Sequence, residues 1–273
     1  MTGEIPSTQR SSSPPAEGVG EVDDARLALG VLAYALAPLA VAWMRGRPGV
    51  DGAWDFLMAV GLVATGGLAI LPLLSARWWA GRHRDPGLLR LVQRLHRQLS
   101  YLMAAFVAAH VLGVLVLEPR TFDYLLPTAP AYMVAGLAAL LLLLVLVVTS
   151  QGGLKRRWPQ ASWRGWHATF SIVGLGALAW HLVGSGFWFV GAGPWWALAW
   201  LLGVPTGLAL YWRGRRTLAA PGGRSGSARR SSPHLLAALA LLLVLACAWF
   251  ALRFPMHAGD AKHPVPCPVG RCL

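Results

Sequence analysis

Seven long apolar stretches, separated by shorter polar and basic segments, set the hydropathy pattern of this chain. Each stretch is close to the roughly 20 residues that an α-helix needs to cross the hydrocarbon core of a bilayer. The pattern therefore predicts an all-α membrane protein, with Pro205 kinking the sixth helix. The expected spans cover about 27–44, 54–74, 95–117, 132–150, 166–189, 195–212 and 235–252.

Composition supports this class and changes how the net charge is interpreted. The 273 residues are 56% hydrophobic and 13% charged, with a mean hydropathy of +0.52, which is typical of a membrane protein. A net charge of +13 would suggest a nucleic-acid partner in a soluble protein. Here the arginines gather at the ends of apolar stretches, so we expect a lipid bilayer and no nucleic acid as partner.

The distribution of Lys and Arg predicts the orientation of the chain. Sixteen of these residues lie at the second-to-third, fourth-to-fifth and sixth-to-seventh junctions, and six lie on the opposite side. The positive-inside rule then places the N-terminus in the cytoplasm and the C-terminus in the periplasm, with the chain in a bacterial inner membrane. Residues 1–24 are polar and predict a disordered tail. They lack the start of a cleavable signal peptide, so the first span is expected to be retained.

Four histidines lie in the apolar spans. His96 and His110 belong to the third span, His167 and His181 to the fifth, and the members of each pair are fourteen residues apart. At about 100° and 1.5 Å per residue, this interval returns to nearly the same helix face about 21 Å further along. Each span thus presents two imidazoles on one face, and Gly174, midway between the second pair, leaves room beside them.

An imidazole in hydrocarbon is costly and needs a partner, which a second helix with the same spacing offers. Haem iron takes axial imidazoles from both of its faces, so we expect His96 with His167 to hold one b-type haem and His110 with His181 a second. The topology agrees, because the third and fifth spans both run outward. One alternative is four unrelated core histidines. Another is a Zn²⁺ or copper site, which would have only two ligands per level where zinc takes four.

Three arginines lie at the inner ends of the histidine spans, namely Arg94, Arg97 and Arg164. Their guanidinium groups match the geometry of carboxylates, so we expect them near haem propionates. Topology alone also explains arginines at these places, and the sequence leaves both explanations open. Four further residues lie near the histidine faces, where they can line a haem cavity, although the sequence favours a packing role over a chemical one for all of them: Ser100, Met103, Val107 and Ser171.

The stretches LHRQLSYLMAAFVAAH and WHATFSIVGLGALAWH resemble the third and fifth helices of the ferric reductase-like transmembrane domain family, each of which carries two histidines at this spacing. The family includes NADPH oxidases, ferric reductases and the membrane subunit of a bacterial methionine-sulfoxide reductase system. The resemblance covers about 54–212. It implies a six-helix ferric reductase-like haem-binding bundle, to which this chain adds a seventh C-terminal transmembrane helix. The implied units are the di-haem domain at 25–213, a basic cytoplasmic linker at 214–233, the extra helix at 234–253 and an extracytoplasmic tail at 254–273.

The resemblance implies electron transfer through two b-type haems. Larger members of the family add a flavin and NADPH module, but no Gly-rich dinucleotide fingerprint follows a strand here. We therefore expect an oxidoreductase component that takes electrons from a separate flavoprotein, bound FMN or FAD, or quinol, and passes them to an extracytoplasmic acceptor. Two alternatives stay open. One is the cytochrome b subunit of a quinol-oxidising complex, although its Pro-Glu-Trp-Tyr motif is absent; the other is a transporter or scaffold without haem.

The three cysteines are too few for a disulfide scaffold. Cys267 and Cys272 lie in the predicted outer tail, where an oxidising compartment favours a disulfide between them. Together with His257 and His263 they alternatively offer a metal site. Cys247, within the seventh span, is expected to be a small core residue.

Overall fold

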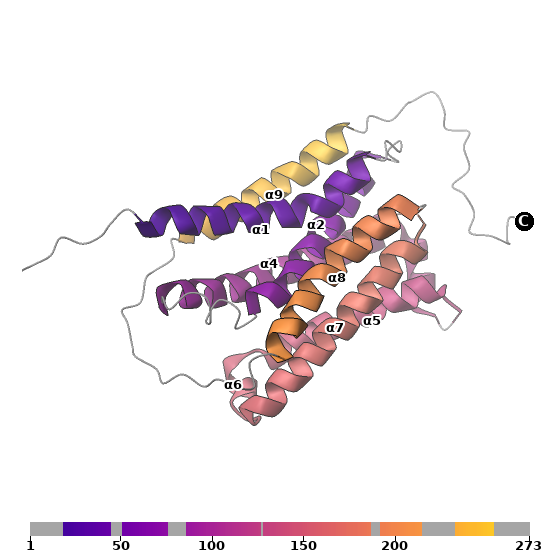
Figure 1. Ribbon diagram of the computed structural model, residues 1–273. Coiled ribbons are helices and arrows are strands. Elements are labelled where there is room, and N and C mark those ends of the chain that lie inside the picture. The colour runs from indigo at the N-terminus through magenta and orange to yellow at the C-terminus, as the bar shows by residue number, and fades with distance from the viewer. Residues whose placement is uncertain are drawn as a thin grey trace, which may run out of the picture.

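The computed structural model describes residues 19–44, 51–75, 86–126, 128–186, 192–214 and 233–253. These ranges contain helices and no strand, as the sequence predicted. In chain order the elements are α1 (Val19–Met44), α2 (Gly52–Ser75), α4 (Pro86–Leu117), the 3₁₀ segment η1 (Pro119–Leu125), α5 (Ala131–Thr149), the single-turn α6 (Gly152–Lys155), α7 (Gln160–Gly184), α8 (Ala192–Gly214) and α9 (Pro233–Arg253). The long helices lie alongside one another as a bundle (Figure 1).

Several of these helices are membrane spans. Within the described ranges, five are long and apolar enough to cross a bilayer, namely α1, α2, α4, α5 and α7. Helices α8 and α9 contain shorter apolar stretches, Trp196–Tyr211 and Ala238–Trp249. The protein is therefore an integral membrane protein that crosses the bilayer several times. The count of six spans plus a seventh stays a prediction.

The two histidine-bearing helices extend further toward the arginine-rich segments than their apolar pattern predicted. Helix α4 begins at Pro86, because proline suits the first helical position and Arg, Gln and Leu continue a helix readily. Helix α7 begins at Gln160 and ends at Gly184, five residues before the predicted end at residue 189. Gly186 has a φ of +61°, the left-handed conformation that commonly terminates a helix, and its N–H donates to the carbonyl of Val183 at 3.1 Å.

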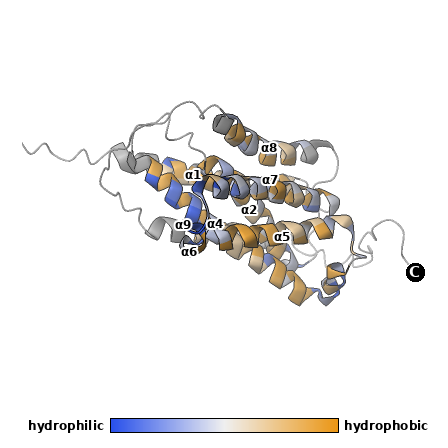
Figure 2. Ribbon diagram, turned by 90° about the horizontal axis from the view of Figure 1, so that it is seen from below, coloured by the Kyte–Doolittle hydropathy of each residue, from blue (hydrophilic) through white to orange (hydrophobic). Residues whose placement is uncertain are grey.

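Helix α2 is the centre of one half of the bundle. It packs most extensively on α4 and also contacts α1, α8 and α9. Small apolar side chains of α2, including Ala59, Val63 and Ala69, are fully buried in these contacts. The other half is a single pair, α5 with α7, in which no residue is buried. The ribbon of α5 is hydrophobic along most of its length (Figure 2).

Some predictions fall on other parts of the chain. Of the linker predicted at 214–233, residues 215–232 lie outside the described residues, and the two end residues belong to α8 and α9. The tail at 254–273, with Cys267 and Cys272, and residues 1–18 also lie outside the described residues. Helix α1 begins at Val19, before the predicted domain boundary at residue 25. Cys247 is fully buried in α9, which fits the small core residue that we expected. Pro205 lies inside α8 and does not end it.

Candidate functional site

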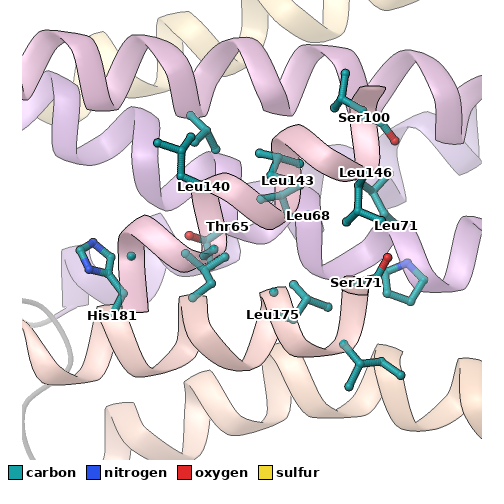
Figure 3. A pocket seen from close by; sticks show the side chains of 18 of the residues that line it. Thr65, Leu68, Leu71, Ser100, Leu140, Leu143, Leu146, Ser171, Leu175 and His181 are labelled. Carbon is teal, nitrogen blue, oxygen red and sulfur yellow. The ribbon is translucent and has the colours of Figure 1, made fainter. Parts of the chain in front are cut away.

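A large cavity lies between α2, α4, α5 and α7. Its volume is about 1580 Å³, well above the ~300–1,000 Å³ of most ligand pockets. All four histidines singled out from the sequence line it: His96, His110, His167 and His181. Leucines from α2 and α5 occupy the region between the histidine levels, as Figure 3 shows for Leu68, Leu140 and Leu143. The cavity is therefore long, and apolar in its middle.

The two histidine-bearing helices face each other across this cavity. Helix α4 packs mainly on α2, and α7 mainly on α5, while direct packing of α4 on α7 is slight over the described residues. All four imidazoles line the space between these helices, and fourteen residues separate the two histidines of each helix along it. The fold thus brings the four histidines to one cavity, and the two pairs that the equal spacing suggested stay a prediction.

Three of the four imidazoles donate a hydrogen bond from Nδ1 to a backbone carbonyl of the helix beside them. The bonds run from His96 to Leu71 (3.1 Å), from His110 to Leu57 (2.9 Å) and from His181 to Tyr132 (3.0 Å). A carbonyl oxygen only accepts, so Nδ1 carries the proton and Nε2 keeps its lone pair. This tautomer is the one required of a metal-binding imidazole, and the bond to the carbonyl fixes the ring orientation.

Two glycines make room for these bonds at the level of His110 and His181. A Cβ at Gly61 of α2 would lie 2.9 Å from Nδ1 of His110. A Cβ at Gly136 of α5 would lie 2.6 Å from Nδ1 of His181. Each glycine is four residues after the carbonyl that accepts the bond, so it lies one turn along the same face. A side chain at either position would push the imidazole away from its acceptor.

The contacts between α2 and α4 recur between α5 and α7. A shift of 75 residues carries Leu57 of α2 onto Tyr132 of α5, and a shift of 71 carries both histidines of α4 onto those of α7. A further contact follows the same shifts. A Cβ at Gly113 in α4 would collide with Leu57, and one at Gly184 in α7 would collide with Tyr132. The two helix pairs therefore hold their imidazoles by one repeated arrangement.

His167 is the exception to this arrangement. Its Nδ1 atom is buried and has no hydrogen-bond partner. The ring of Trp163, one turn earlier in α7, covers the ring of His167, with centroids 4.8 Å apart and planes inclined by 31°. The indole Nε1 of Trp163 donates to the carbonyl of Thr149 at 3.1 Å, and Nζ of Lys155 lies 4.2 Å from its ring centroid. Trp163 therefore links His167 to the end of α5 and to α6.

Cationic side chains line the cavity near His96 and His167. Arg94 and Arg97 flank His96 in α4, and Arg164 lies three residues before His167 in α7. Two more cations line the same cavity and were not singled out from the sequence, namely Arg90 and Lys155. We call this region, lined by Arg90, Arg94, Arg97, Lys155 and Arg164, the basic end. We call the region around His110 and His181 the far end; it is lined by Trp54, Thr121, Tyr124 and Tyr132.

The other residues expected to line the cavity divide into two groups. Ser100, Val107 and Ser171 do line it, and both serine hydroxyls donate to a histidine carbonyl one turn earlier in their own helix at 2.7 Å. Met103 does not line the cavity and packs instead, which is the role that the sequence favoured. Its side chain is fully buried between α4 and α2, where Gly67 leaves the space that it fills. The face of α4 that carries the histidines is therefore narrower than their spacing alone indicated.

The donor set fits some prosthetic groups better than others. Within the described residues, no three His, Cys, Asp or Glu side chains are grouped as a conventional metal site requires. The histidines come in twos, which is half of the usual zinc set. Two imidazoles on opposite sides of a gap are what a six-coordinate haem iron takes. The residues present therefore fit haem and do not fit zinc.

The features that sequence reasoning missed are the acceptor carbonyls, the glycines beside them and the ring of Trp163. Carbonyls carry no sequence signal. The glycines do carry a sequence signal. Glycine inside a helix costs about 1 kcal/mol relative to alanine, so its presence indicates a place where another backbone or a ring approaches closely. Gly61 and Gly136 lie within apolar stretches of α2 and α5, where this argument would have pointed to a close contact.

Comparison with known proteins supports the resemblance noted in the sequence. The chain matches the family model described as "Ferric reductase like transmembrane component" over residues 29–178. The match covers α1 to most of α7 and includes His96, His110 and His167, and His181 follows three residues beyond it. No curated protein and no solved structure matches the chain significantly. On the family match, which spans more than half of its length, the chain belongs to the ferric reductase-like transmembrane component family.

Proposed function

We propose that this chain is a membrane di-haem b-type cytochrome, in which His96 with His167 ligates one haem iron and His110 with His181 the other. The observation that carries the proposal is the arrangement of four imidazoles around one cavity, three of them bonded through Nδ1 to neighbouring carbonyls. This arrangement leaves Nε2 free to bind iron. It also provides two ligands at each of two levels.

The cavity suits two haems in size and in polarity. Fourteen helical residues separate the levels by about 21 Å, and the volume of about 1580 Å³ exceeds that of a pocket for one small ligand. The leucines between the levels suit the apolar faces of a macrocycle. Arg94, Arg97 and Arg164 at the basic end suit the propionate carboxylates, which guanidinium groups bind in a matched geometry.

The chemistry that haem supplies when bound is one-electron transfer. The residues of this chain orient and insulate the two sites. The two imidazoles at each level would hold a haem iron from both sides, so each site would suit the passage of electrons and not the binding of a substrate at the metal. The fully buried side chains that pack α2 on α4 exclude water from that wall of the cavity.

The charge distribution supports a direction for electron transfer. By the positive-inside rule the basic end faces the cytoplasm, with the N-terminus on that side and the C-terminus on the outer side. We propose that the membrane is a bacterial inner membrane, so that the outer side is the periplasm. Electrons enter at His96 and His167 from a cytoplasmic flavoprotein, from bound FMN or FAD, or from quinol. They leave at His110 and His181 to an extracytoplasmic protein, to ferric iron or to oxygen.

The test is a reduced-minus-oxidised absorption spectrum of detergent-purified protein, with haem per chain measured as the pyridine haemochrome. We expect a six-coordinate b-type spectrum and two haems per chain. One haem per chain would contradict the two-level assignment. No haem, after expression with ample haem supply, would overturn the proposal and return the chain to the class of transporter or scaffold.

A further inference from the structure

The two imidazoles at the basic end are held in different ways. His96 donates from Nδ1 to the carbonyl of Leu71, whereas Nδ1 of His167 is buried without a hydrogen-bond partner. A buried N–H that lacks an acceptor loses the hydrogen bonds it makes with water, so this arrangement is unfavourable by itself. Something other than a hydrogen bond at Nδ1 must therefore fix the ring of His167.

The repeated helix pairs indicate which carbonyl His167 lacks. The shift of 75 residues between α2 and α5 carries Leu71 onto Leu146, and both lie at the same end of the cavity, away from His181 (Figure 3). The carbonyl of Leu146 already has partners of its own. It accepts the hydroxyl of Ser150 at 2.6 Å, the N–H of Ser150 at 3.2 Å and the hydroxyl of Thr149 at 3.4 Å. The acceptor that corresponds to Leu71 is therefore occupied.

Ser75 is the counterpart of Ser150 in α2, and its hydroxyl has a different partner. It donates to the carbonyl of Pro72 at 2.7 Å, so the carbonyl of Leu71 stays open to His96. The two helices thus differ in where one serine hydroxyl points. In α2 the carbonyl at this level accepts an imidazole, and in α5 it accepts a serine.

A ring contact with Trp163 is present at His167, where the other three imidazoles have a bond to a carbonyl. Its ring lies against the ring of His167 at a centroid distance of 4.8 Å. The indole is held from two further sides, by its hydrogen bond to the carbonyl of Thr149 and by the ammonium group of Lys155 over its face. A ring fixed at three places can restrain the imidazole that it covers.

We infer that Trp163 is a positioning residue for His167, and that its tilted ring contact takes over the role of the carbonyl bond that Ser150 prevents. This inference rests on the proposed haem ligation. A carbonyl that accepts from Nδ1–H raises the basicity of the imidazole, and such second-shell bonds tune the potential of a haem. The far-end haem has two ligands of this kind and the basic-end haem has one. Weaker donation stabilises the reduced iron, as do the nearby arginines, so the basic-end haem has the higher midpoint potential.

The first test replaces the ring of Trp163. In the full-length, haem-loaded Trp163→Leu protein we expect a shift in the largest g value of the basic-end low-spin EPR signal. We also expect its midpoint potential to fall, because water then reaches Nδ1–H of His167. Trp163→Phe keeps a ring and should stay close to the wild type. Trp166→Leu is the matched control, because Trp166 is 53% exposed on the same helix and its ring contacts Phe170.

The second test removes the competing hydroxyl. In Ser150→Ala the carbonyl of Leu146 loses its closest donor and keeps only the longer bonds from the N–H of residue 150 and the hydroxyl of Thr149. We expect it then to accept from Nδ1–H of His167, so the basic-end potential should fall while the far-end potential stays. Ser75→Ala is the matched control, because its hydroxyl bonds to Pro72 and removing it leaves the bond from His96 to Leu71 in place. In each experiment the basic-end signal is identified as the one that survives in His110→Ala.

The outcomes separate this inference from the proposed function. Wild-type protein without haem would defeat both. Two haems in the wild type, with the basic-end signal unchanged in Trp163→Leu and Ser150→Ala, would overturn the inference and leave the proposed function intact. Loss of the basic-end haem alone in Trp163→Leu would support the role of Trp163. If that variant loses both haems, Ser150→Ala decides, and an unchanged basic-end signal there overturns the inference.

Discussion

The pair α2–α4 and the pair α5–α7 form two walls of one cavity in very different surroundings. Many residues of α2 are buried, under α1, α4, α8 and α9, whereas no residue of α5 or α7 is buried. Yet both pairs repeat the same bond from imidazole to carbonyl at the far end. The comparison teaches that the contacts which hold an imidazole belong to the helix pair itself. Burial by further helices adds stability but does not create the site.

The exposed pair needs its own means of association. Large apolar side chains such as Leu141, Leu144 and Trp180 are more than half exposed, as suits surfaces that face lipid. Helices in lipid gain little from apolar burial and depend on close packing at small residues. Gly136 and Gly184 supply such places between α5 and α7. Glycine in these helices therefore serves both helix association and the placement of the imidazole.

Midway along each helix pair, a glycine of one helix faces a large side chain of the other, and the helix that carries the glycine differs between the two pairs. Gly67 of α2 receives Met103 of α4, whereas Gly174 of α7 receives Leu142 of α5. The shifts of 75 and 71 residues carry Gly67 onto Leu142 and Met103 onto Gly174. The volume at this level is thus conserved between the pairs although the residues are not, as close packing requires.

Replacing a histidine should have the largest effect on haem content. If each haem takes one ligand from each pair, His110→Ala and His181→Ala must remove the same haem, and His96→Ala with His167→Ala the other. We expect haem per chain to fall from two to one in all four variants, measured as the pyridine haemochrome. In a redox titration, the two variants of one level should retain a haem with the same midpoint potential. Two different surviving components within one level would contradict the pairing.

The next effect comes from the glycines beside the far-end imidazoles. Gly61→Ala and Gly136→Ala place a methyl group 2.9 Å and 2.6 Å from Nδ1 of their histidines, which displaces the bond to the carbonyl. Losing a second-shell bond typically costs about 10–100-fold in affinity, and we expect that loss at the far-end haem in a haem titration of the apoprotein. Gly176→Ala is the control, since a Cβ there meets nothing within 4 Å. Equal haem affinity in all three variants would show that the close contact is irrelevant.

Much of this arrangement could be predicted from the sequence, for reasons that particular residues make clear. The apolar stretches and the equal spacing of His96 with His110 and His167 with His181 report helix length and helix face, which depend only on helical geometry. The family followed from the same residues. Helix ends were less accurate, because Arg94 and Arg164 continue a helix as well as they end an apolar stretch.

The rest depends on contacts between helices, which no periodicity records. Met103 lies near the histidine face by angle, but the space left by Gly67 draws it into the contact with α2. Ser75 and Ser150 differ in the carbonyl to which their hydroxyl donates. Because both residues are serine, the sequence does not predict this difference. Trp163 is of a residue type that is common at membrane interfaces. Its contact with the ring of His167, one turn later, gives it the additional role of positioning that ring.

A smaller effect tests whether the two helix pairs tolerate an added methyl group equally well at the far end. A Cβ at Gly113 would meet the methyl groups of Leu57, which can rotate away, so Gly113→Ala should cost little and gain about 1 kcal/mol of helix propensity. A Cβ at Gly184 would meet Cβ of Tyr132, which cannot move without the backbone. Gly184→Ala should therefore lose about 1–3 kcal/mol. Thermal unfolding in one detergent measures both, and the reverse order would contradict the comparison.

The smallest effect concerns how α2 and α5 begin. Asp51 accepts hydrogen bonds at Oδ1 from the N–H groups of Ala53 and Trp54, at 2.8 and 2.9 Å, whereas α5 follows Pro130 and has no side-chain cap. Asp51→Ala removes a cap worth about 1 kcal/mol, and Asp51→Asn should keep it. We expect faster amide exchange in the first turn of α2 for the alanine variant alone. That turn precedes Leu57 by little more than one turn, so a change there should also weaken the far-end bond from His110, and α5 should be unaffected. Equal exchange in the alanine and asparagine variants would show that α2, like α5, begins without help from a side chain.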